Sequence, residues 1–154
     1  MKIIKLGLTG SIGMGKTRTT LMFKYLGIPV FDADEKVHEL FTKNTILIQQ
    51  IEENFKGVVT NQKVNRKILG NIVFNNKKKK ETLENLVHPF VRIERKKFTN
   101  NAIRNRFPIV LYDIPLLFET KSEKFYDYIL VVSAPKFLQE NRVLKRSGIT
   151  KDIF

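Results

Sequence analysis

The chain has 154 residues, no cysteine and a formal net charge of +13. This length suits one domain with a hydrophobic core. The lack of cysteine excludes disulfides and thiolate metal sites. No apolar run approaches the length of about 18 residues that spans a membrane. The charge favours a polyanionic partner, such as a nucleotide, a coenzyme or RNA, over a neutral one, unless it reflects only a lysine-rich surface.

The N-terminal part of the chain is expected to form a buried strand, a helix and a second short strand. Their apolar patterns cover residues 2–8, 16–26 and 28–31. The helix pattern places Leu21, Met22 and Leu26 in the core, and Gly27 ends it.

The middle of the chain reads as mostly helical. Helical spacing of apolar residues is found in three stretches, residues 45–55, 64–74 and 77–106, and residues 32–41 are expected to be a loop that turns into a helix. Pro89 is expected to kink or divide the last of them. Residues 33–106 are therefore expected to be a helical insert within a single domain of residues 1–154.

Two further strands and a helix follow, over residues 108–113, 128–133 and 135–145. The strands are continuous apolar runs separated by helices, a pattern typical of a parallel sheet covered on both faces. The expected fold class is therefore α/β, with three layers.

A complete phosphate-binding motif, the P-loop, follows the first strand. It reads Gly10-Ser11-Ile12-Gly13-Met14-Gly15-Lys16-Thr17. Its glycines let backbone N–H groups wrap a phosphate at the start of a helix. Lys16 is expected to reach the β- and γ-phosphates of ATP, and the Thr17 hydroxyl to bind Mg²⁺. With Arg18, these residues form the predicted ATP site.

Three acidic residues end strands or follow them. Asp32 and Asp34 come at the end of the second strand, where the carboxyl ends of parallel strands share a crevice. One of them could accept a proton from a hydroxyl, help to hold Mg²⁺, or cap a helix. Asp113 ends the strand of residues 108–113 and has the form of a carboxylate that supports the metal opposite Thr17.

Basic residues could complete such a site. Arg142 and Arg146 recur, after Gln139, at helical spacing near the end of the chain, as arginines on a lid over a migrating phosphoryl group would; a solvated helix face is the alternative. Arg66 and Arg92 could bind phosphates of an acceptor or pair with nearby acids.

Several segments in order resemble the dephospho-coenzyme A kinase family, over essentially the whole chain. Besides residues 8–17, they are Gly27-Ile-Pro-Val-Phe-Asp-Ala-Asp34, Val64-Asn-Arg66, Val87-His-Pro-Phe-Val-Arg92, Asp113-Ile-Pro-Leu-Leu-Phe-Glu119, Val131-Val-Ser-Ala-Pro135 and residues 139–146. The resemblance implies a P-loop kinase fold and transfer of the ATP γ-phosphate to the ribose 3′-hydroxyl of dephospho-coenzyme A, the last step of coenzyme A synthesis.

The resemblance also implies roles for single residues. Asp34 would be the general base, with Asp32 beside it at the acceptor. The insert would bind the acceptor near Arg66, His88 and Arg92. Arg142 and Arg146 would belong to a lid over ATP that begins in residues 142–154, with Arg142 among the catalytic groups.

Two departures from the family pattern stand out. Asn65 occupies a position where the family has Asp, which we expect to be a mild structural change. Family members also continue well beyond Phe154, so the resemblance implies that the last strand of the sheet and the rest of the lid are missing, and that full activity is uncertain.

Other functions remain open on the sequence alone. They are a P-loop kinase of another small acceptor, such as a nucleoside monophosphate, an inactive relative that only binds nucleotide, and a basic nucleic-acid-binding protein that keeps a vestigial P-loop. A nucleic-acid partner is not expected, since no known motif for one is present. We expect a cytoplasmic protein with no membrane partner and leave its oligomeric state open.

Overall fold

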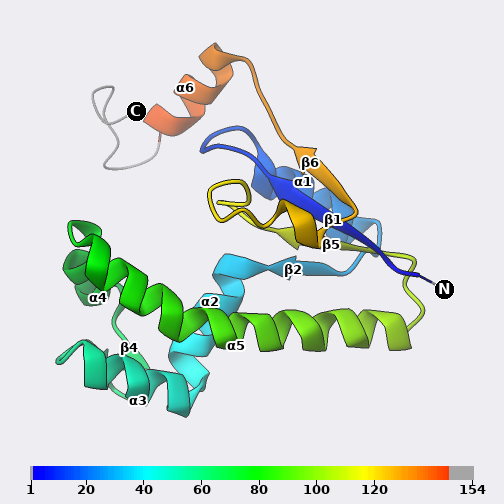
Figure 1. Ribbon diagram of the computed structural model, residues 1–154. Helices are drawn as coiled ribbons and strands as arrows, with labels where there is room; N and C mark the ends of the chain where they lie inside the picture. The colour runs from blue at the N-terminus through cyan, green and yellow to red at the C-terminus, as the bar shows by residue number, and fades with distance from the viewer. Residues whose placement is uncertain (1, 146–154) are drawn as a thin grey trace. The chain divides into compact units, whose positions relative to one another are not determined.

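The computed structural model describes residues 2–145 (Figure 1). Its elements are β1 (Ile4–Thr9), α1 (Lys16–Tyr25), β2 (Val30–Asp32), α2 (Ala33–Lys43), α3 (Thr45–Asn54), β3 (Val59–Thr60), β4 (Lys63–Val64), α4 (Arg66–Phe74), α5 (Lys77–Arg104), β5 (Ile109–Asp113), the 3₁₀ turn η1 (Glu123–Phe125), β6 (Tyr128–Val131) and α6 (Lys136–Leu144). Within these residues, no helix is long and apolar enough to cross a membrane.

The chain divides into two compact units. One combines the residues up to Asp32 with those from Thr99 onward, and the other is Ala33–Phe98. The second unit begins where the helical insert was expected to begin, but it ends inside α5, before residue 106.

The first unit is built on a four-stranded sheet in the order β2-β5-β1-β6, with every neighbouring pair parallel. This confirms the parallel sheet expected from the apolar runs. In its register, Asp113 at the end of β5 lies between Leu8 of β1 and Asp32 of β2. The carboxyl ends of these strands therefore meet at one edge, directly beside the residues that follow β1.

Helices lie on both faces of this sheet. Tyr112 and Asp113 are consecutive residues of β5, so their side chains point to opposite faces. The Tyr112 hydroxyl lies 2.6 Å from the Thr99 hydroxyl of α5, and Asp113 accepts a 2.7 Å hydrogen bond from Thr20 of α1. The unit thus has the three expected layers, with the sheet in the middle.

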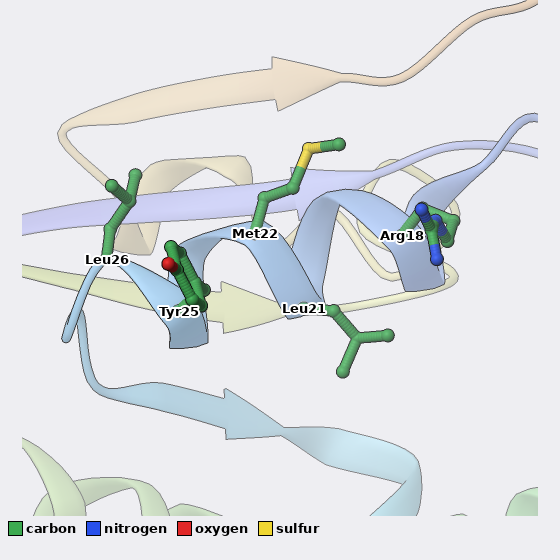
Figure 2. A pocket seen from close by; sticks show the side chains of 5 residues that line it. All are labelled: Arg18, Leu21, Met22, Tyr25 and Leu26. Carbon is green, nitrogen blue, oxygen red and sulfur yellow. The ribbon is translucent and has the colours of Figure 1, made fainter.

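Helix α1 presents the opposite face to the one expected. Leu21, Met22 and Leu26, predicted to be in the core, are 51%, 59% and 70% exposed, whereas Thr20 is buried. Figure 2 shows these apolar side chains with Arg18 and Tyr25 around a shallow pocket on the helix, with the sheet strands behind it. The prediction was wrong because the bond from Thr20 to Asp113 turns the Lys16 and Thr20 side of α1 toward the sheet.

The second unit has its own apolar core, formed by α2, α3, α4, β4 and part of α5. Leu47, Ile51 and Val58 are completely buried there. A two-stranded antiparallel hairpin, β3-β4, occupies residues 59–64, where no strand was predicted. Helix α5 is one continuous helix with Pro89 inside it, so of the two alternatives left open by the sequence, a kink or a division at Pro89, the division does not occur.

Candidate active site

The P-loop connects β1 to α1 in the first unit. Gly13 and Gly15 have φ angles of 77° and 106°, which L-amino acids with side chains rarely adopt. Gly15 is also the N-cap of α1, and its carbonyl accepts the first backbone bonds of that helix, from Arg18 and Thr19. The loop therefore delivers Lys16 and Thr17 to the first turn of α1, at the positive end of the helix dipole.

Helix α6 supports the P-loop. A Cβ atom at Gly13 would lie 2.7 Å from the Val143 side chain, so only glycine permits this approach. Gln139 Nε2 donates to the Ile12 carbonyl at 2.9 Å, and Arg142 Nη1 donates to the Gly13 carbonyl at 3.1 Å. Because both side chains bind carbonyl oxygens, they do not compete for the loop N–H groups that hold phosphates in a P-loop.

Lys16, Asp113 and Thr20 form a connected polar cluster at the foot of the loop. Lys16 Nζ is ion-paired with Asp113 Oδ1, and the Thr20 hydroxyl donates to Oδ2. The Asp113 side chain is only 5% exposed and that of Lys16 is 20% exposed. Burial strengthens such charged contacts and makes either partner costly to remove.

The other predicted ATP and metal residues lie around this cluster. Thr17 and Arg18 are exposed at the start of α1, and Asp32 is aligned with Asp113 in the sheet. No group of three or more His, Cys, Asp or Glu side chains that could enclose a metal occurs within residues 2–145. Mg²⁺ in kinases is usually held by one or two carboxylates together with substrate phosphates and water.

A hollow of about 480 Å³ opens beside the P-loop, within the size range of ligand pockets. One side is formed by loop residues, and the other by the segment after β5 and the end of β6. Leu116 and Phe118 of that segment are about half exposed, and Glu119 also lines the hollow. The Pro-Leu-Leu-Phe-Glu segment noted in the sequence thus borders the phosphate loop.

The predicted acceptor residues other than Asp32 belong to the second unit. Asp34 is in the first turn of α2, Arg66 begins α4, and His88 and Arg92 are four residues apart on α5. All four side chains are exposed, so each is accessible to a ligand. Asn65 caps α4 by accepting from the N–H groups of Lys67 and Ile68, at 3.1 and 3.2 Å, so the asparagine retains a structural function. Arg146 lies outside the described residues.

Residues 4–153 of the chain match the sequence pattern of the dephospho-CoA kinase family. The chain belongs to this family. Among its relatives, the dephospho-CoA kinase of Bartonella quintana is 48% identical over all 154 residues, which are 77% of its own length. The dephospho-CoA kinase of Paramagnetospirillum magneticum is 47% identical over 98% of the chain and 70% of its own length.

Solved structures agree with this family relationship. A crystal structure from Thermus thermophilus superposes with a TM-score of 0.82 at 30% identity, over 99% of this chain and 76% of the other. The dephospho-CoA kinase of Campylobacter jejuni superposes with a TM-score of 0.68 at 29% identity, over 95% of this chain and 74% of the other. The P-loop kinase fold implied by the sequence is thereby confirmed.

Two site residues were given no role on sequence grounds. Thr20 reaches Asp113, and Gln139 reaches the Ile12 carbonyl. Thr20 is four residues after Lys16 and so lies on the same side of α1, a spacing that could have pointed to it. Gln139 is separated from its partner by 127 residues, and no local pattern in the sequence indicates that contact.

Proposed function

We propose that this chain transfers the γ-phosphoryl group of ATP to the ribose 3′-hydroxyl of dephospho-coenzyme A. The observation that carries the proposal is the complete P-loop, with Lys16 paired to Asp113, in a chain that belongs to the dephospho-CoA kinase family. A cytoplasmic location and two small-molecule substrates, ATP and dephospho-coenzyme A, are part of the same proposal.

The nucleotide half of the reaction is assigned to the first unit. The backbone N–H groups of residues 10–17 would wrap the phosphates, and Lys16 would leave Asp113 to reach the β- and γ-phosphates. Arg18 would contact ATP from the start of α1. Arg142 and Arg146 would supply positive charge over the migrating group, as arginines of phosphoryl-transfer enzymes do.

Magnesium suits the residues at the foot of the loop. A hydroxyl at Thr17 and a carboxylate at Asp113 are hard oxygen donors, and Mg²⁺ in kinases is held by one or two such groups together with substrate phosphates. The buried position of Asp113, beside a lysine that phosphates would draw away, fits this use. When bound, the ion would neutralise charge that builds up on the phosphate oxygens.

The acceptor half is assigned to Asp34, Asp32 and the second unit. The 3′-oxygen would bond to the γ-phosphorus as the bond from that phosphorus to the oxygen bridging the β-phosphate breaks, so that ADP leaves. The Asp34 carboxylate would take the proton of the hydroxyl. Arg66, His88 and Arg92, all exposed, would bind the acceptor, with Asp32 near the reacting hydroxyl.

An acceptor panel tests this assignment. The chain is incubated with Mg-ATP and dephospho-coenzyme A, or instead with AMP, CMP or shikimate, and the products are analysed by mass spectrometry and phosphorus NMR. A product phosphorylated at the ribose 3′ position of dephospho-coenzyme A is expected. Phosphorylation of a nucleoside monophosphate in preference would replace this assignment with that of another P-loop kinase.

A further inference from the structure

The Thr20 hydroxyl contacts a strand of the sheet, unlike the hydroxyl of the adjacent Thr19. Helical threonines commonly donate to the carbonyl one turn earlier, as Thr19 does to Gly15 at 3.4 Å. The Thr20 hydroxyl oxygen lies 3.1 Å from the Lys16 carbonyl oxygen but 2.7 Å from Oδ2 of Asp113, which is on strand β5. A hydroxyl has one proton, and the shorter distance and negative charge favour the carboxylate.

The two oxygens of Asp113 therefore have different partners. Oδ1 is paired with Lys16, and Oδ2 accepts from Thr20. The proposed function requires Lys16 to move to phosphates while Asp113 helps to hold Mg²⁺. Oδ1 would then lose Lys16 as its partner, whereas nothing in the reaction requires Oδ2 to release Thr20.

We propose that Thr20 is a positioning residue for Asp113, whose carboxylate it holds by Oδ2 when Lys16 leaves Oδ1, so that the carboxylate would be oriented to help hold Mg²⁺. The inference rests on the proposed function and adds a residue to it. A carboxylate on a short side chain can rotate about its last bond when one oxygen loses its partner. Thr20 is only 4% exposed, so water hardly reaches its hydroxyl. The bond from this hydroxyl opposes the rotation of the carboxylate.

The test compares nucleotide binding with and without the metal. Isothermal titration calorimetry with a non-hydrolysable ATP analogue gives the dissociation constant in Mg²⁺ and in EDTA, and their ratio is the gain due to the metal. Thr20→Val removes the hydroxyl and retains the branched shape. We expect it to reduce this gain about tenfold, as loss of a group that orients a metal ligand does, with little change in EDTA.

Three variants control the experiment. Thr20→Ser keeps a hydroxyl and is expected to keep the wild-type gain. Thr20→Ala removes the hydroxyl without the bulk of valine, and it replaces Thr20→Val in the test if the valine variant does not fold. Thr19→Val alters the adjacent helical threonine, whose hydroxyl bonds to the Gly15 carbonyl of the same helix end, and is expected to keep the gain. In Thr20→Val and Thr20→Ala, the Mg²⁺ concentration that gives half-maximal turnover should rise by a larger factor than kcat falls.

The outcomes are separable. Equal weakening of binding in Mg²⁺ and in EDTA would show that Thr20 only supports the loop, and an unchanged gain would show that it has no bearing on the metal; either result overturns the inference. A wild-type chain without any gain from Mg²⁺ would instead contradict the proposed metal site, and this inference with it.

Discussion

At the scale of single residues, the pair of Lys16 and Asp113 joins stability to function. The Asp113 carboxylate is buried and has a charged partner in Lys16, and a buried charge that loses its partner is destabilising. The same lysine is required for phosphate binding in the proposed mechanism. Substitution at this position should therefore affect folding as well as transfer.

Replacement of Lys16 by methionine is expected to abolish phosphoryl transfer and to lower the free energy of unfolding by about 1–3 kcal/mol, because the buried Asp113 carboxylate loses its charged partner and keeps the bond from Thr20. The double variant Lys16→Met/Asp113→Asn should recover most of that stability and no activity. Urea denaturation and ADP release measure the two effects. Turnover by the single variant would show that the P-loop lysine is not needed.

Replacement of Asp34 by asparagine tests the proposed general base. Loss of the carboxylate should lower turnover by about 10²–10⁴-fold, the usual contribution of a positioned base, and leave the dissociation constant for Mg-ATP little changed. Glu35→Gln is the matched control, since it removes the same charge from the same first turn of α2 and should keep its activity. An Asp34→Asn variant that loses ATP affinity but not turnover would assign Asp34 to binding.

At the scale of the elements, the approach of α6 to the P-loop should depend on Gly13. Gly13→Ala is expected to lower the free energy of unfolding by about 1–3 kcal/mol, since its Cβ would overlap Val143 and the φ angle is positive. Gly70→Ala, in the interior of α4 with open space at its Cβ position, should instead stabilise by about 0.5–1 kcal/mol. Thermal unfolding of both variants makes the comparison; similar changes in the two would contradict the packing described here.

The β3-β4 hairpin is tied to α3 by Glu52. Its carboxylate accepts from the N–H groups of Gly57, Val58 and Val59 at 2.8, 3.2 and 2.9 Å. These bonds, the one from Gly57 foremost, hold the pKa of Glu52 below its ordinary value of 4.5. A lowered pKa in the folded state means that the stabilisation is present above the ordinary pKa and is lost as the pH falls through the folded value.

Glu52→Gln should therefore melt at a lower temperature than the wild type near pH 7, and the difference should vanish as the pH falls well below 4.5. Glu53→Gln is the control, because its carboxylate accepts only an exposed side-chain bond from Gln49 among the bonds described. Its melting temperature should follow that of the wild type across the pH range. A constant difference between Glu52→Gln and wild type at every pH would exclude the carboxylate as the cause.

The elements differ in how far the sequence predicts them. The P-loop and the apolar strands are predictable because their signals are local. The face of α1 is not, because it depends on the contact between Thr20 and Asp113, 93 residues apart. The hairpin is also missed: its strands are two residues long, and its turn has Asn61 and Gln62 at positive φ without the glycine that usually marks such a turn.

The candidate site is predictable to a similar degree. Motif spacing identifies Lys16, Thr17 and Asp113, and the structure brings Lys16 and Asp113 into contact. The supporting contacts of Thr20 and Gln139 depend on the folded chain. The roles of Asp34, Arg66, His88 and Arg92 come from the family resemblance, and they remain predictions for the experiments described above.

At the scale of the whole molecule, the chain spans 77% and 70% of the length of two dephospho-CoA kinases that it resembles. The P-loop, its supporting helix α6 and the buried pair of Lys16 and Asp113 are all within residues 2–145. The net charge of +13 suits two substrates that both carry several phosphate charges. The kinase activity of these 154 residues can therefore be measured directly.

The most direct test of the proposed kinase activity is ADP release from Mg-ATP by this chain, with and without dephospho-coenzyme A. We expect release that depends on the acceptor, with one phosphate added per ADP formed. If a folded chain that binds ATP releases no ADP when dephospho-coenzyme A is added, the proposed activity of this chain is contradicted.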